Sequence, residues 1–164
     1  MTRQESNRYS LSTIGHSNHS METFLKLLQQ FQIQVVVDVR SQPYSRYVPH
    51  FRKEALQQFL EEAGVRYLFL GRELGGRPSG DEFYDGEGQV LYRQLAESAL
   101  FQEGIARLEK GLENYRVALM CSEEDPAKCH RLWLLGRVLQ ERGVEVSHIR
   151  GDGTLQGQRE SLNF

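Results

Sequence analysis

The two cysteines of the chain, Cys121 and Cys129, lie in one short polar segment that also contains Glu123, His130 and Arg131. The segment follows an apolar run typical of a buried strand and precedes the apolar start of an amphipathic helix. Thiols, carboxylates, imidazoles and guanidinium groups are the side chains that nucleophilic and acid–base chemistry use. A polar loop between a core strand and a helix is a common position for the site of an α/β protein.

Within this segment Cys121 is the candidate nucleophile or redox thiol, and Cys129 is its resolving partner. Cys129 precedes a predicted helix beside His130 and Arg131, and helix N-termini and cations lower the pKa of a thiol. The acids between the cysteines would raise both thiol pKa values unless they point away. The alternative interpretation is that two small residues simply pack at a strand–helix junction.

A metal site built from Cys121, Cys129, His130 and His16 is a further interpretation of these residues. Seven residues separate the two cysteines, whereas zinc-binding cysteine pairs are usually closer. Adjacent Cys129 and His130 would also point about 100° apart on a helix. We therefore predict neither a metal nor another cofactor.

Proton transfer is assigned to Asp38, Glu123 or His16. Asp38 follows the buried strand Val35–Val37 and is a candidate general base, or it orients Arg40 or caps its own turn. His16 lies in a Gly-His-Ser loop after the first predicted strand. His148 lies inside a strand pattern, so a structural role is the better interpretation for it.

Arginines make up the second group of candidate residues. Their planar guanidinium groups match phosphate and carboxylate, so a cluster of them predicts an anion-binding cleft, although any single one is also explained as a solvated charge. Aromatic residues in the same loops would stack a nucleotide base or pack the loops down. The residues assigned to ligand binding are Arg40, Ser41, Tyr47, Arg72, Arg77, His130 and Arg131.

Strands alternate with helices along the chain, which predicts a single-domain, three-layer α/β/α fold with a mainly parallel sheet of about five strands and right-handed crossovers. Polar residues follow each predicted strand, and ligands bind at the carboxyl ends of such strands. If the first strand neighbours the strand that begins at Val117, His16 lies close to Cys121. The predicted strands are residues 9–14, 35–37, 65–70, 117–120 and 144–149.

The domain is predicted to span residues 9–153, between a flexible N-terminus, residues 1–8, and a C-terminal tail, residues 154–164. A helix is expected from about Cys129 to Arg142. The glycine-rich stretch from Gly71 to Gly88 is long for a loop in a compact domain, and such loops are often functional or mobile, as a lid would be.

Composition narrows the class of protein. Hydrophobic residues make up 39% of the 164 residues and charged residues 26%, as in a globular domain. The net charge of −2 argues against non-specific DNA binding but permits a local basic cleft. No run approaches the roughly 18 apolar residues that span a bilayer, and the N-terminus lacks a signal-peptide pattern. We expect a cytoplasmic protein with no membrane partner.

Several motifs together resemble an uncharacterised family, domain of unknown function 488. The resemblance runs from about residue 10 to residue 153 and implies a small α/β fold, but it implies no reaction. The matching motifs are Thr13–Ser17, Val37–Ser41, Pro43–Tyr47, Pro49–Phe51, Leu70–Gly71, Leu74–Arg77, Leu119–Glu123, Cys129–Arg131, His148–Ile149 and Asp152–Gly153.

These observations predict a cysteine-dependent enzyme that acts on a phosphorylated or nucleotide-like ligand, bound at the C-terminal edge of the sheet. The alternative is a non-catalytic module that binds a nucleotide or nucleic acid through the same arginine-lined cleft. In either case the expected partner is a small anionic ligand or nucleic acid. The sequence does not indicate an oligomeric state.

Overall fold

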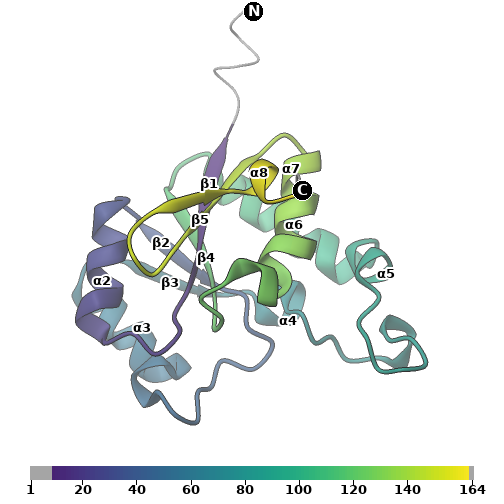
Figure 1. The fold of residues 1–164 in the computed structure, drawn as a ribbon, viewed down its shortest axis with the longest axis horizontal. Helices are drawn as coiled ribbons and strands as arrows, with labels where there is room; N and C mark the ends of the chain where they lie inside the picture. Colours follow the sequence, from purple (N-terminus) through teal and green to yellow (C-terminus); the bar gives the residue numbers. More distant parts are fainter. Residues whose placement is uncertain (1–8, 163–164) are drawn as a thin grey trace, which may run out of the picture.

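The computed structural model describes residues 9–162, so the predicted flexible segment, residues 1–8, lies outside the described residues. A single mixed sheet runs through the molecule in the order β3-β2-β4-β1-β5-β6 (Figure 1). The first five strands are parallel, and only β6 is antiparallel to its neighbour. The strands are β1 (Ser10–Gly15), β2 (Val35–Asp38), β3 (Arg66–Phe69), β4 (Val117–Cys121), β5 (Glu145–Ile149) and β6 (Leu155–Gly157).

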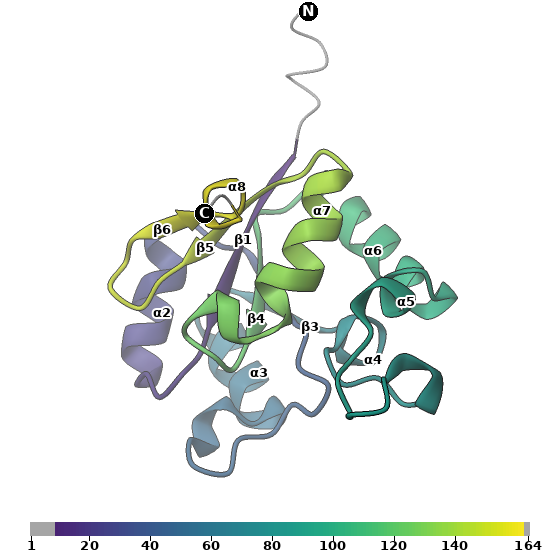
Figure 2. The same ribbon diagram turned by 45° about the vertical axis from the view of Figure 1, so that its right-hand side comes forward.

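Helices cover both faces of the sheet, and this arrangement confirms the predicted three-layer α/β fold with a mainly parallel sheet (Figure 2). One face carries α2 (Met21–Gln30) and α3 (Lys53–Glu62), with the 3₁₀ turn η1 (Pro49–Phe51) beside them. The opposite face carries α4 (Gly71–Leu74), α5 (Tyr92–Ala96), α6 (Ala99–Leu112), a π-helix called η4 (Arg131–Gly136) and α7 (Arg137–Glu141). The remaining short elements are η2 (Asp81–Phe83), η3 (Pro126–Lys128) and α8 (Gln158–Ser161).

Strand β4 illustrates how the sequence divides the core in two. Successive side chains of a strand point to opposite faces of the sheet. Val117, Leu119 and Cys121 therefore join the core under α4–α7, whereas Ala118 and Met120 join the core under α2 and α3. All five residues are buried, as expected for a central strand of a parallel sheet. The alternation fixes the side of the sheet on which the Cys121 thiol lies.

The neighbouring strands β1 and β4 form a topological switch point. The chain leaves β1 toward α2 on one face, and it leaves β4 toward η4 on the other face. Ligands of open α/β sheets bind where the connections diverge in this way. The sequence placed His16 close to Cys121 on the condition that these two strands are neighbours. That condition is met, and the backbone N–H of His16 donates to the carbonyl oxygen of Cys121 over 2.9 Å.

Two segments differ from the expected element boundaries. Residues 131–141 are helical without a break, close to the helix expected from about Cys129 to Arg142, but Cys129 is extended before them and Arg131–Gly136 form a π-helix ahead of α7. Residues 155–161, which lie in the segment predicted to be a tail, form β6 and α8, and they pack against β5 and η4. Among residues 9–162, no helix has both the length and the apolar character needed to cross a lipid bilayer.

Candidate functional site

The two thiols and one imidazole meet at the C-terminal edge of the sheet. Cys121 ends β4 and is 4% exposed, whereas Cys129 lies between η3 and the π-helix and is half-buried. The two sulfur atoms and a ring nitrogen of His130 lie within 4.8 Å of one another. His130 Nε2 donates to the carbonyl oxygen of Leu74 over 3.0 Å, which ties the imidazole to α4. The structure therefore brings the predicted thiol pair together.

Arg131 is fully buried directly behind the thiols. Its backbone N–H and its Nε both donate to the sulfur atom of Cys129, at 3.4 and 3.1 Å. Its Nη1 donates to the hydroxyl of Thr13 over 2.9 Å, and its Nη2 donates to the carbonyl oxygens of Glu123 and Glu124. All three guanidinium nitrogens of Arg131 therefore donate to protein atoms. The side chain holds the cysteine loop in place and does not bind an external anion.

The charge of Arg131 has no carboxylate to balance it among the described ion pairs. A buried cation without a counter charge is strongly unfavourable. The Cys129 sulfur can supply that counter charge as a thiolate. A hydrogen bond from the Cys121 thiol, together with His130 and Arg131, lowers the pKa of Cys129 well below its ordinary value, although burial opposes the shift. The same hydrogen bond and burial raise the pKa of Cys121.

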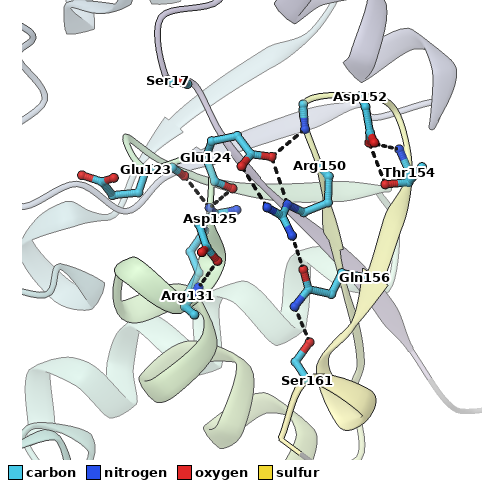
Figure 3. A network of polar contacts seen from close by, with 12 residues as sticks. Ser17, Glu123, Glu124, Asp125, Arg131, Arg150, Asp152, Thr154, Gln156 and Ser161 are labelled. Carbon is cyan, nitrogen blue, oxygen red and sulfur yellow. Dashed lines mark hydrogen bonds and ion pairs between the residues drawn. The ribbon is translucent and has the colours of Figure 1, made fainter.

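Two acidic residues of the cysteine loop, Glu124 and Asp125, are held by hydrogen bonds to other groups of the protein (Figure 3). The carboxylate of Glu124 receives hydrogen bonds of 2.9 Å from Nε and Nη2 of Arg150, and one of 2.8 Å from the backbone of Gly151. These contacts lower the pKa of Glu124 to about 2. Asp125 instead accepts from the backbone N–H of Ala127 and begins η3. The carboxylates of Glu124 and Asp125 are therefore paired with partners other than Cys129.

A buried relay supports the guanidinium from the far side. The Thr13 hydroxyl accepts from Arg131, so its own hydrogen is donated to Nδ1 of His148 over 2.7 Å. His148 Nε2 then donates to Oε1 of Gln158, also over 2.7 Å, and Gln158 Nε2 donates to the carbonyl oxygen of Leu132. Burial lowers the pKa of His148 to about 4. The relay joins β1, β5, α8 and the π-helix around one cation.

Asp38, Arg40 and His16 form a second closed network. The Arg40 guanidinium donates to both carboxylate oxygens of Asp38, and its Nη1 donates to Nε2 of His16 over 3.2 Å. His16 Nδ1 donates to the carbonyl oxygen of Ser17, and the Tyr67 hydroxyl donates to Asp38 over 2.6 Å. Burial is the main reason that the pKa of His16 falls to about 4. Each of these polar groups is already paired within the protein.

A pocket of about 820 Å³ opens above the thiols. Arg40, Arg77 and Lys128 contribute positive charge to its lining, and within residues 9–162 no aspartate or glutamate contributes to it. Cys121 and Cys129 line the same space. A pocket of this charge suits a small anion.

The structure gathers part of the predicted site at this pocket. Ser41 lies in the lining and accepts a hydrogen bond of 2.8 Å from the backbone of Arg77. The residues assigned to the site that line the pocket are Arg40, Ser41, Arg77, Cys121, Cys129 and His130. Those that do not line it are His16, Asp38, Tyr47, Arg72, Glu123 and Arg131.

Sequence reasoning missed several residues of the site. Lys128 was recognisable, because it is a cation directly before Cys129. Tyr92 also lines the pocket, and burial is the main reason that its pKa is raised. Thr13 belongs to a motif that resembles the family, but nothing in the sequence indicated its role, and Gln158 carries no signal at all. Their contacts depend on strand order and on the position of α8.

The same three ligand atoms could hold a soft metal ion, because two thiols and an imidazole are common ligands for zinc. Two features oppose this use. The Arg131 guanidinium lies against the sulfur of Cys129, where it would repel a metal cation. His16, the fourth ligand considered from the sequence, has both ring nitrogens paired elsewhere and stacks on Phe51.

Fold and site together define a small α/β protein with one buried and one half-buried thiol under a cationic pocket at the sheet edge. The sequence model of the family described as domain of unknown function DUF488 matches residues 20–138, and the chain belongs to this family. No curated protein and no solved structure matches the chain. Thr13, His148 and Gln158, which complete the relay behind Arg131, lie outside the matched residues.

Proposed function

We propose that the protein is a cysteine-dependent enzyme that acts on a small anionic ligand, phosphorylated or nucleotide-like, bound in the pocket above Cys121 and Cys129. The observation that carries the proposal is the contact between Cys129 and a fully buried arginine that no carboxylate neutralises among the described residues. A thiolate is the reactive form of cysteine. The lining of the pocket keeps this thiolate beside cations rather than acids.

Cys129 rather than Cys121 is the nucleophile in this proposal. Cys129 is the more exposed of the two, and Arg131 donates two hydrogen bonds to its sulfur atom. The Cys121 thiol is 4% exposed and retains its proton. This assignment exchanges the roles that the sequence alone suggested.

The proposal is tested by measuring the rate at which a neutral alkylating agent, iodoacetamide, modifies each cysteine as a function of pH, with peptide mass spectrometry as the readout. Cys129 should react as a thiolate well below pH ~8.5, the ordinary pKa of a thiol. Inorganic phosphate or AMP should protect it. Arg77→Gln should weaken the protection, whereas Arg93→Gln, on an exposed residue outside the pocket, should not. Two thiols that react only above pH ~8.5, with no protection, would refute the proposal.

A second function, non-catalytic binding of a nucleotide or nucleic acid, is favoured by a different observation. Tyr47 and Tyr44 are 84% and 60% exposed, and the Arg46 and Arg52 guanidinium groups lie 5.7 and 4.4 Å from the centres of their rings. Exposed aromatic rings beside arginines provide stacking surfaces for bases. Oligonucleotide binding that is unchanged in Cys129→Ser and lost in Tyr47→Ala would support this alternative.

A further inference from the structure

We infer that the ligand of this site reacts through a sulfur–sulfur bond: the substrate is an anionic disulfide, which Cys129 attacks and Cys121 resolves. The inference rests on the proposed function and names the bond that the thiolate breaks. Its basis is the pairing of two thiols in a pocket that offers cations but no carboxylic acid.

The first argument concerns the leaving group. Breaking a phosphate or carboxylic ester releases an alkoxide, which usually needs a general acid. Among residues 9–162 no carboxyl group lines the pocket, and the Nε2 proton of His130 is already donated to Leu74. The Tyr92 phenol has a raised pKa and is a weak acid. A thiolate, in contrast, is stable enough to leave without a proton donor, and Arg77 and Lys128 would stabilise its charge.

The second argument concerns the guanidinium. Enzymes that transfer phosphoryl groups place an arginine or backbone amides on the phosphate oxygens. Arg131 is fully buried, and its Nε, Nη1 and Nη2 all donate to protein atoms. Arg40 is likewise committed to Asp38 and His16. The guanidinium groups of Arg131 and Arg40 are therefore already paired within the protein. The cations left to bind a ligand are the exposed Arg77 and Lys128, which would hold a charged group remote from the reacting bond.

The third argument concerns the second thiol. Cys121 lies at the rigid end of a central strand, and its sulfur is within 4.8 Å of the Cys129 sulfur. Because Cys121 is the more buried of the two, an incoming disulfide reaches Cys129 first. Cys129 adopts an extended backbone between two short helical elements, which allows its sulfur to approach Cys121. These positions are those of an attacking thiol and a resolving thiol.

The reaction balances as two exchanges. The Cys129 thiolate attacks one sulfur of the substrate R–S–S–R′, forms the mixed disulfide Cys129–S–S–R and releases R′–S⁻. The Cys121 thiol gives its proton to this leaving thiolate, attacks the Cys129 sulfur and releases R–S⁻. Two electrons pass from the thiol pair to the substrate, and the Cys121–Cys129 disulfide remains. An external thiol reductant restores the pair. Because Arg131 stabilises the thiolate and not the disulfide, this reset is favourable.

The test uses oxidised glutathione, which carries carboxylates, and cystamine, a disulfide of similar chemistry that carries amines. In excess oxidised glutathione the wild-type chain should form the Cys121–Cys129 disulfide. Cys121→Ser should stop with one glutathionyl group on Cys129, and Cys129→Ser should not react. Cystamine should react about tenfold more slowly at low salt, and the difference should shrink as salt is added. Arg77→Gln should lower the rate with glutathione, and Arg93→Gln should not.

Three outcomes would overturn the inference. One is a Cys121→Ser chain that behaves as wild type, with Cys121→Ala used as a second variant if the serine variant unfolds. Another is cystamine reacting as fast as oxidised glutathione. The third is one equivalent of tightly bound zinc with both thiols inert, because the cluster would then be a metal site. If Cys129 alkylates at low pH and phosphate protects it, but no disulfide exchanges, the inference fails while the proposed function stands.

Discussion

Replacing Thr13 by valine tests the buried relay behind Arg131. Valine has the shape of threonine but lacks the hydroxyl, so the change removes two hydrogen bonds, to Arg131 at 2.9 Å and to His148 at 2.7 Å. A buried hydrogen bond to a charged group contributes about 1.5–3 kcal/mol, and one between neutral groups contributes about 1 kcal/mol. The expected loss in the free energy of unfolding is therefore about 3 kcal/mol.

Urea unfolding followed by circular dichroism measures this loss. The midpoint should fall by about 1–2 M with an unchanged slope. Thr13→Ser is the matched control, because it retains the hydroxyl and removes only a methyl group, which costs about 1 kcal/mol. Thr23→Val, at an exposed position near the start of α2, should change the midpoint little. Equal losses for the valine and serine variants would refute the relay, since packing alone would then explain both.

Two further predictions concern pH and a close contact. His16 and His148 have folded pKa values of about 4 and an ordinary value of 6.5, so the unfolded chain binds more protons between these values. The contribution of the two histidines to stability should be complete above about pH 6.5 and should fall toward about pH 4, by up to 1.4 kcal/mol per pH unit for each histidine. Urea unfolding at several pH values measures this change. A free energy of unfolding that is flat over this range would contradict the lowered pKa values of His16 and His148. A β-carbon at Gly76 would lie 2.9 Å from Cγ of His130, whereas one at Gly86 would meet no atom within 4 Å. Gly76→Ala should therefore lower the unfolding free energy by about 1–2 kcal/mol and Gly86→Ala should not, in the same urea assay.

Local patterns were sufficient to predict most of the fold. Val35–Val37 is an uninterrupted β-branched run, and it forms part of β2, an interior strand between β3 and β4. His16 was expected near Cys121 on the condition that β1 and β4 are neighbours, and the structure meets this condition. These features depend on a few neighbouring residues or on general rules for parallel sheets, which explains why the sequence contained them.

Contacts that depend on exact strand order could not be predicted. Thr13 and His148 are paired across β1 and β5, which are separated by more than a hundred residues. The π-helix was also missed, because its residues have the apolar spacing of an ordinary helix. The hydrogen bond from Gln158 to the Leu132 carbonyl within it joins residues that lie far apart along the chain. The location of the candidate site was visible in the sequence, but the partners that hold its charge were not.

Arg131 has no carboxylate partner among the described ion pairs, so the charge of the Cys129 sulfur affects the stability of the whole fold. Irreversible alkylation of Cys129 removes the negative charge that faces this fully buried cation. Leaving a buried charge without its partner typically costs about 3–5 kcal/mol, a large part of the stability of an ordinary domain. A chain whose Cys129 carries a neutral alkyl adduct therefore unfolds more often and becomes accessible to proteases. Proteases would therefore degrade chains that have lost the Cys129 thiolate faster than chains that retain it.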